Sequence, residues 1–156
     1  MQRPSWDQYF LSFLPIIASR ATCDRGRSAC LLVKNNAIIA TGYVGSAPGE
    51  PHCDEVRHLM VKQFNDDGSI SDHCVRTLHC EQNALAQAAK LGISVDQATA
   101  YISMEPCPVC AKLLSRSGIK RIVCLKKYHA AKLSRELLAK ANVELIIIND
   151  EVEQYT

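Results

Sequence analysis

One histidine, one glutamate and two cysteines between residues 79 and 110 have the types and spacing of a hydrolytic metal site. His79 and Glu81 form an H-x-E pattern in TLHCEQ, and Cys107 and Cys110 form P-C-x-x-C in EPCPVC. Three protein ligands leave the fourth position of a tetrahedral zinc ion open for water, which is typical of catalytic rather than structural zinc. Zinc lowers the pKa of such a water to about 7. Glu81 is then expected to move protons without being a ligand itself.

Two helix starts are expected to position these side chains. The segment 78–91 is rich in Ala, Leu and Gln and is followed by a glycine, which predicts a helix with His79 and Glu81 in its first turn. Because the positive end of a helix stabilises anionic groups, this placement suits a carboxylate beside a metal.

The second helix is predicted at 106–117, with Pro106 as its first residue and a glycine after its end. Cys107 and Cys110 then lie on one face of that helix. The structural alternatives are a zinc-ribbon-like site or a redox C-x-x-C pair. The proline before the pair and the H-x-E upstream favour the catalytic interpretation.

Composition limits the class of protein. A chain of 156 residues with 47% hydrophobic and 22% charged residues is expected to form one domain over 1–156. The formal charge of +2 is too small to indicate a nucleic-acid or membrane surface. No apolar run has the length of a membrane span, and the start MQRPSWDQYF lacks a signal-peptide core. We therefore expect a cytoplasmic protein whose eight cysteines are thiols or metal ligands rather than disulfides.

Residues 42–76 are expected to form an irregular loop, rich in Gly and Pro at its beginning. A loop of this length in a compact domain requires a stabilising element, and the predicted element is a second zinc site with a closed set of ligands. Its candidate ligands, which would stabilise an insert around 45–76, are Cys23, Cys53, His58 and Cys74. His52 and His73 compete with His58 for the fourth position. The alternative is a set of free thiols packed as small hydrophobic residues, with exposed histidines.

The remaining segments predict an α/β layered fold with parallel strand pairs in its second half. Residues 5–20 carry a helical apolar stripe that Pro15 is expected to kink or shorten. Asn35 and Asn36 lie between two apolar strands and predict a β-hairpin. Three further strands are expected in ATAYISM, IKRIVCL and VELIIIN, with a helix at 132–141. Cys30 and Cys124 fall within strand patterns and are interpreted as core.

The loop before the first strand holds Arg25, Arg27 and Ser28. Guanidinium groups and a hydroxyl are the groups from which a phosphate site is built. The alternative, equally open on the sequence alone, is a solvated loop in which these side chains have no specific role.

The chain resembles the deoxycytidylate (dCMP) deaminases of the cytidine deaminase superfamily, in particular the small microbial and phage enzymes of the competence-operon type. The resemblance rests on SWDQYF, ATGYVGSAPGEPHCDEV, HCVRTLHCEQNALAQAAKLGISVDQAT and PCPVCAKLLSRSGIKRIV, in that order along the chain. It implies a three-layer fold, with a mixed sheet of about five strands flanked by helices. It also implies zinc-dependent deamination of dCMP to dUMP and ammonia, which supplies dUMP for thymidylate synthesis.

The resemblance assigns roles by position. It implies a catalytic zinc on His79, Cys107 and Cys110, with Glu81 as general acid and base. A structural zinc would bind Cys23, Cys53, His58 and Cys74. Substrate contacts are implied for Cys80 through its backbone N–H, for Tyr128, and for the phosphate loop of Arg25, Arg27 and Ser28. Homo-oligomers, often hexamers, and regulation by dCTP and dTTP are implied as well.

Three positions depart from the family pattern. Cys80 stands where an alanine is usual, Val44 replaces an asparagine expected to bind the sugar, and EPC before the cysteine pair resembles tRNA-adenosine deaminases. Two alternatives therefore stay open: a deaminase acting on a nucleic-acid base, and a catalytically inactive, zinc-stabilised nucleotide-binding module. Base editing requires a basic surface and room for a flipped base.

Overall fold

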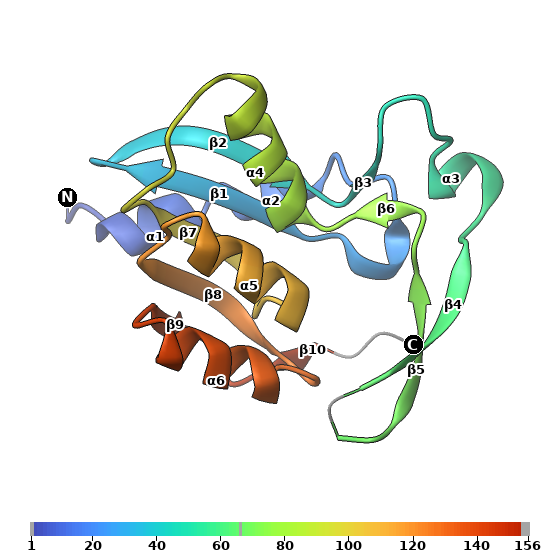
Figure 1. The fold of residues 1–156 in the computed structure, drawn as a ribbon. Helices are drawn as coiled ribbons and strands as arrows, with labels where there is room; N and C mark the ends of the chain where they lie inside the picture. The colour runs from blue at the N-terminus through green and yellow to red at the C-terminus, as the bar shows by residue number, and fades with distance from the viewer. Residues whose placement is uncertain (1, 66, 154–156) are drawn as a thin grey trace.

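A mixed six-stranded sheet forms the centre of the molecule in the computed structural model, which describes residues 2–65 and 67–153 (Figure 1). Its strands are β1 (Ala29–Lys34), β2 (Ala37–Tyr43), β7 (Thr99–Met104), β8 (Arg121–Tyr128), β9 (Glu144–Ile147) and β10 (Val152–Glu153). Strand β1 is antiparallel to both β2 and β7, whereas β8 is parallel to β7, β9 and β10. The predicted parallel pairs of the second half are therefore confirmed.

Helices cover both faces of this sheet. Two short ones, α1 (Trp6–Leu11) and α2 (Leu14–Ala18), lie on one face, and α4 (Cys80–Lys90), α5 (Pro108–Arg116) and α6 (Lys132–Lys140) lie on the other (Figure 1). The alternation of β1 explains this arrangement, because successive side chains of a strand point to opposite faces. Leu31 packs with Phe10 in one core cluster, and Leu32 packs with Leu114 in the other. The predicted three-layer α/β fold is confirmed.

Two local predictions in the first third of the chain are confirmed. Asn35 and Asn36 have φ values of 52° and 58°, so they form the tight turn between β1 and β2 that favours these residues. The helical stripe is interrupted before Pro15, which lies in the first turn of α2, where a missing backbone N–H costs nothing. Ser5 caps α1 by accepting a hydrogen bond from the backbone N–H of Gln8.

The predicted starts of the two helices that carry the candidate metal ligands are both wrong by two residues. Helix α4 begins at Cys80, with His79 as its N-cap in an extended conformation. Helix α5 begins at Pro108 rather than Pro106, with Cys107 as its N-cap. Both capping residues have ψ near 160°, which directs their side chains across the helix start instead of along its side.

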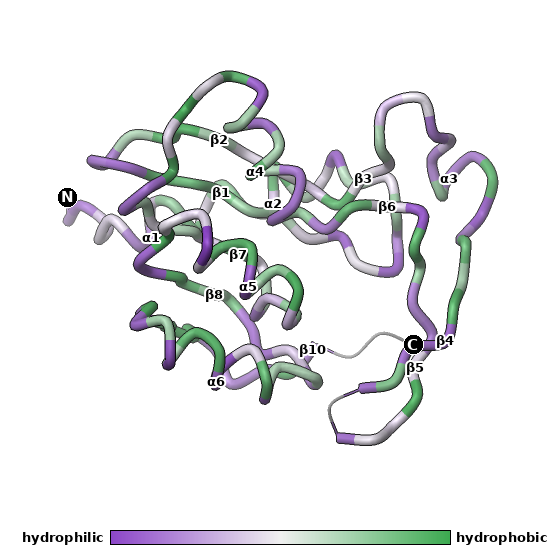
Figure 2. The backbone as a smooth tube through the Cα atoms, viewed as in Figure 1, coloured by the Kyte–Doolittle hydropathy of each residue, from purple (hydrophilic) through white to green (hydrophobic). Residues whose placement is uncertain are grey.

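The insert is more regular than predicted. It contains β3 (Gly45–Ser46), α3 (Cys53–Val56), β4 (Met60–Phe64) and β5 (Ile70–Cys74), and is followed by β6 (Thr77–Leu78). Strands β4 and β5 pair as a hairpin that projects beyond the sheet (Figure 1). All five residues of β4 are exposed. The sequence there therefore lacks the alternation of apolar and polar residues that predicts a half-buried strand. Figure 2 shows hydrophobic segments on this hairpin as well as on the central strands.

The strand predicted in VELIIIN is present as β9, which is only partly buried and is followed by the short strand β10. Both pair with successive parts of β8 at the edge of the sheet, and an edge strand retains contact with solvent. Within the described residues, no helix combines the length and apolar character needed to cross a membrane.

Candidate active site and metal centres

His79, Cys107 and Cys110 converge at the starts of α4 and α5. The Nδ1 atom of His79 lies 3.5 Å from the Sγ atom of Cys107 and 3.5 Å from the Sγ atom of Cys110. A tetrahedral zinc ion with Zn–S and Zn–N bonds of about 2.3 and 2.0 Å separates sulfur from nitrogen by roughly 3.5 Å. Two thiols and an imidazole at these separations therefore fit a zinc ion.

The backbone around these ligands fixes their positions. Gln82 accepts a hydrogen bond from the backbone N–H of His79 at 2.8 Å, which holds the start of α4. The Sγ atom of Cys107 accepts from the backbone N–H of Cys110 at 3.5 Å. His79 and Cys107 are thus each the N-cap of a helix, and the positive end of α5 favours the thiolate form of Cys107 over the thiol.

The ionisation of the three candidate ligands reflects their mutual contacts. The hydrogen bond with Cys110 lowers the pKa of Cys107 to about 4, and His79 adds to this effect. The Cys107 sulfur in turn raises the pKa of His79 to about 9. Cys110, which donates to Cys107, has its pKa raised. Of the two thiols, that of Cys107 is therefore the easier to ionise, and metal binding to such a pair releases the remaining proton.

Glu81 lies next to this cluster and is 5% exposed. Burial raises the pKa of its carboxyl, whereas the neighbouring His79 opposes that change. The Cys80 thiol donates a hydrogen bond to Glu81 Oε2 at 3.2 Å, and the hydroxyl of Ser28 donates to the Cys80 sulfur at 3.5 Å. A desolvated carboxyl held in this way is a suitable general acid and base near neutral pH.

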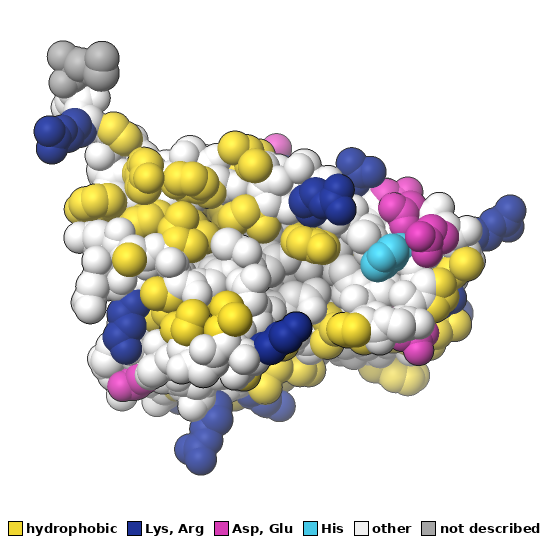
Figure 3. Space-filling model, turned by 90° about the horizontal axis from the view of Figure 1, so that it is seen from above, with side chains coloured by type: hydrophobic (Ala, Val, Ile, Leu, Met, Phe, Trp, Pro, Cys, Tyr) yellow, Lys and Arg dark blue, Asp and Glu magenta, His cyan; other side chains and the backbone are white. Residues whose placement is uncertain are grey.

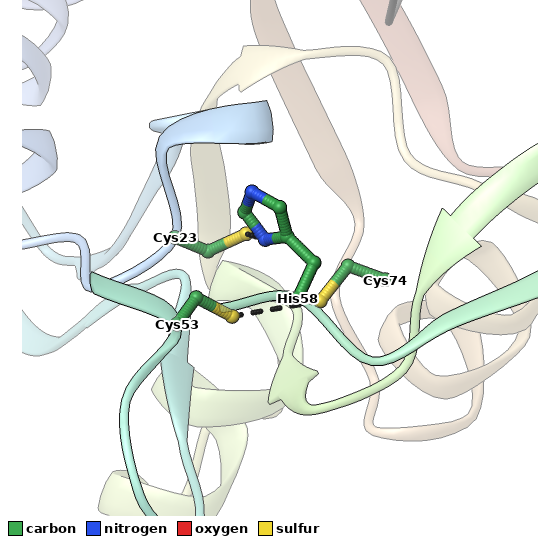
Figure 4. Close-up of side chains that lie close together, drawn as sticks. All are labelled: Cys23, Cys53, His58 and Cys74. Atoms are coloured by element: carbon green, nitrogen blue, oxygen red, sulfur yellow. Dashed lines mark hydrogen bonds between the residues drawn. The ribbon is translucent and has the colours of Figure 1, made fainter. Parts of the chain in front are cut away.

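A second cluster of four side chains lies where the insert meets the loop before β1. Cys23, Cys53, His58 and Cys74 have ligand atoms that all lie within 4.8 Å of one another. Their side chains point toward a common centre (Figure 4). Cys53 and Cys74 are 3.5 Å apart at sulfur, and Cys23 Sγ is 3.6 Å from His58 Nδ1. A closed set of three sulfurs and one imidazole fits a structural zinc ion.

The two histidines that competed with His58 lie outside this cluster. His52 is the N-cap of α3, where its backbone N–H donates to Glu55 Oε2. The imidazole of His73 is 2.9 Å from the hydroxyl of Ser71, and burial lowers its pKa. Neither ring shares the centre defined by the three cysteines.

A cavity of about 80 Å³ opens beside Glu81. All the expected substrate-contacting residues except Arg27 line it, as do several of the expected metal ligands: Arg25, Ser28, Cys80 and Tyr128, with His79, Glu81, Cys107, Cys23 and Cys74. Arg27 is exposed and is not among the lining residues. Val44 contributes to an apolar part of the wall, together with Ile102 and Met104. The cavity therefore contacts the candidate metal ligands and has both polar and apolar side chains in its wall.

Glu105 is a cavity residue that the sequence interpretation missed. Its carboxylate is completely buried and accepts two hydrogen bonds from Arg135, each 2.7 Å long. It also accepts one from the backbone N–H of Tyr128 at 3.0 Å. Glu105 therefore fixes the part of β8 that brings Tyr128 to the cavity. An acidic residue directly before the P-C-x-x-C pattern was the only signal in the sequence.

Comparison with known proteins identifies the family. Residues 4–126 match the family model described as the cytidine and deoxycytidylate deaminase zinc-binding region. ComE operon protein 2 of Bacillus subtilis is 36% identical over 143 residues, which cover 92% of this chain and 71% of the relative. The deoxycytidylate deaminase of Mycobacterium phage D29 is 34% identical over 130 residues, covering 81% of this chain and 99% of the relative.

A solved structure with the same fold is that of the dCMP deaminase of cyanophage S-TIM5 in complex with dCMP and dUMP. It has a TM-score of 0.74 and 25% identity, and the match covers 94% of this chain and 99% of that one. The chain belongs to the cytidine and deoxycytidylate deaminase family. It is accordingly a zinc-dependent deaminase, and the resemblance noted in the sequence is confirmed.

Proposed function

We propose that this protein hydrolyses dCMP to dUMP and ammonia, which supplies dUMP for thymidylate synthesis. The observation that carries the proposal is a buried carboxyl, Glu81, placed beside a three-ligand metal cluster at the wall of a cavity. The relatives named above support the substrate, because they include dCMP deaminases and a structure with dCMP and dUMP bound.

In this proposal His79, Cys107 and Cys110 hold the catalytic zinc. Zinc bound there supplies the Lewis acidity that makes hydroxide available near neutral pH. Glu81 accepts one proton from the attacking water and delivers it to the ring nitrogen; it then accepts the second proton from the hydroxyl added to the ring carbon and delivers it to the departing amine. One water is consumed, the C–N bond to the exocyclic amine breaks, and ammonia leaves, so atoms and charge balance. A raised pKa suits Glu81 to both the basic and the acidic steps.

The remaining cavity residues are proposed to bind the nucleotide. Arg25 and Ser28 lie on the wall where a guanidinium and a hydroxyl would hold a phosphate. The ring of Tyr128 would pack beside the substrate, with its backbone fixed by Glu105. The backbone N–H of Cys80 would bind the pyrimidine carbonyl. Val44 gives the sugar an apolar neighbour in place of an amide.

The chain is proposed to act as one deaminase domain whose insert is held by a second zinc on Cys23, Cys53, His58 and Cys74. A homo-oligomer, with a hexamer favoured, is proposed as its working form. The exposed apolar side chains of the hairpin support an interface, since Phe64 is 77% exposed. Regulation by dCTP and dTTP remains a prediction.

Substitution of Glu81 by Gln tests the mechanism. Gln keeps the size of the side chain but cannot transfer protons, so turnover of dCMP should fall by about 10²–10⁴-fold while zinc content is unchanged. Ammonia release with wild-type protein and with the Glu81→Gln protein, alongside metal analysis, measures both quantities. A variant that retained the wild-type rate would exclude the assigned role of Glu81.

The same ammonia assay separates dCMP from its competitors. We expect release from dCMP to exceed release from CMP, deoxycytidine and a tRNA anticodon stem. On the face shown in Figure 3, Lys and Arg side chains are spread among acidic ones rather than gathered into a patch, which does not favour nucleic acid there. Activity confined to the tRNA stem would replace dCMP by a nucleic-acid base.

A further inference from the structure

The second metal cluster borders the substrate cavity. Cys23 and Cys74 belong to the cluster and also line the cavity. Arg25 and Asp72, which are not part of the cluster, line the same cavity. The Nη2 atom of Arg25 donates to the backbone carbonyl of Asp72 at 3.0 Å. The segment that carries Arg25 and the end of β5 are therefore joined twice, by the cluster and by this hydrogen bond. One wall of the cavity depends on both connections.

Asp24 makes a contact with the cluster that no sequence motif indicated. It lies directly after Cys23, in the short 3₁₀ turn η1 (Asp24–Gly26). Its Oδ1 atom is 3.0 Å from His58 Nε2, while Nδ1 on the opposite side of the same ring faces Cys23 Sγ at 3.6 Å. The Nε2 side of the His58 ring thus contacts Asp24, and its Nδ1 side faces the cysteines.

This contact determines which nitrogen of His58 can bind a metal. With Nε2 as the donor to Asp24, the proton of the neutral ring lies on Nε2 and the lone pair on Nδ1 points into the cluster. Carboxylates that accept from the outer nitrogen of a metal-binding histidine fix its tautomer and raise its basicity. As an ion pair alone the contact would contribute little, because the Asp24 side chain is 73% exposed. Its effect is expected in metal affinity.

We propose that Asp24 is the positioning residue for the second metal ion, and that this ion holds the Arg25 wall of the substrate cavity. The proposal rests on the proposed function for the identity of the substrate, whereas its metal-binding part does not. It assigns a role to Asp24 that is distinct from proton transfer by Glu81. It also makes the second ion a determinant of nucleotide binding, in addition to its part in holding the insert.

The test compares Asp24→Ala with Asp24→Asn, which keeps an acceptor for the imidazole N–H, and with Glu50→Ala. Glu50 is an exposed acid in the loop before Cys53, so its removal matches the change in charge. Each protein is titrated against a chromophoric zinc chelator, and bound zinc is counted. Wild type and Glu50→Ala are expected to hold two ions. Asp24→Ala is expected to bind the second ion about 10–100-fold more weakly, with Asp24→Asn between them.

Two further readouts examine the link to the cavity. At chelator concentrations that remove only the weaker ion, amide hydrogen exchange at residues 23–28 and 70–76 should rise in Asp24→Ala before it rises in the control. The KM for dCMP should increase in the same variant, with a smaller change in kcat. Equal zinc retention in Asp24→Ala, Glu50→Ala and wild type would overturn the proposal, as would a single ion in wild type. Neither zinc retention nor exchange depends on turnover, so failure of the proposed activity is recognised separately.

Discussion

Arg25 and Arg27 come from the same short segment but have different surroundings. Arg25 lines the cavity and reaches the backbone of Asp72, whereas Arg27 is exposed and lies outside the cavity wall. If Arg25 binds the phosphate, Arg25→Ala should lower kcat/KM for dCMP by about 10–100-fold, because a charge-assisted hydrogen bond contributes about 1.5–3 kcal/mol. The value for deoxycytidine, which has no phosphate, should change little. Steady-state kinetics on both substrates measures the difference.

Arg27→Ala provides the matched control, since it removes the same charge two residues away. It is expected to leave both substrates unchanged within about twofold, as surface substitutions usually do. Equal losses on dCMP and deoxycytidine in the Arg25 variant would place the phosphate elsewhere in the cavity.

The residues that approach one another within a motif were predictable from sequence. His79, Cys107 and Cys110 follow from ligand spacing that zinc sites require, and the structure brings them together. Asp24 and Glu105 act on side chains or backbone more than twenty residues away, at His58 and Tyr128. Their neighbours in the sequence do not reveal which residue they pair with, because the pairing is created by the tertiary fold.

At the scale of elements, the contact between α4 and β2 determines where the start of α4, with His79 and Glu81, lies. A Cβ atom added to Gly42 of β2 would collide with the carbonyl oxygen of Cys80 and the backbone nitrogen of Ala84. Side chains of α4 also bind β2 directly, since Asn83 donates to the carbonyl of Tyr43 at 2.8 Å. The helix start therefore rests on the strand with no space for a methyl group.

Gly42→Ala should force α4 away from β2 and displace Glu81 with it. The atoms that the methyl group would meet belong to the backbone of α4, which can move less easily than a side chain. We therefore expect the free energy of unfolding to fall by about 3 kcal/mol, at the upper end of overpacking costs. Deaminase activity should fall as well. Chemical denaturation and turnover of dCMP measure the two effects.

Gly45→Ala is the comparison for that substitution. The methyl group there would meet the ring of Tyr43, at 3.1 Å from its Cε2 atom, and this half-exposed ring can move. A small change in stability is therefore expected. If Gly42→Ala were as mild as Gly45→Ala, the close approach of helix and strand would not control the site.

Elements with a buried face could be predicted, and those without one could not. Strand β1 is buried along most of its length and β7 and β8 along half of theirs, and their apolar runs identified them. The sequence predicts a loop over the hairpin of β4 and β5, because exposure on both faces of β4 removes the periodic signal. The predicted helix starts are two residues too early because His79 and Cys107, the first candidate metal ligands of the two motifs, are N-caps rather than helical residues.

Across the whole molecule, one ion pair ties the N-terminal helix to the central sheet. Arg121 of β8 donates two hydrogen bonds of 2.7 Å to the carboxylate of Asp7 in α1, and the hydroxyl of Tyr101 donates a third at 2.8 Å. Hydrogen bonding with Arg121 holds the pKa of Asp7 below its ordinary value, with Tyr101 adding to the effect, although burial opposes it.

This pair predicts how stability depends on pH. Because the pKa of Asp7 is lowered in the folded state, its contribution is complete above the unfolded value near 3.8 and is lost as pH falls through the folded value. Asp7→Asn should therefore lower the free energy of unfolding by about 1–2 kcal/mol at pH 7. The difference from wild type should shrink below about pH 4. Thermal unfolding of both proteins over pH 3–7 measures it.

Glu144→Gln is the control, since Glu144 also contacts Arg121 but is 61% exposed at the side chain. We expect its effect to stay below about 0.5 kcal/mol. A constant difference between wild type and Asp7→Asn from pH 7 to pH 3 would contradict the role given to ionised Asp7.

The position of β1 in the sheet has a consequence for synthesis on the ribosome. Leu31 of β1 pairs with Tyr101 of β7. Because β7 is translated much later than β1, one edge of β1 stays unpaired during part of synthesis. Until β7 emerges, β1 and β2 form a two-stranded ribbon, which is marginal in water and has an open edge. Such edges invite association with other nascent chains. Translation speed and chaperone supply should therefore influence the yield of this protein more than they would for a fold assembled from neighbouring segments.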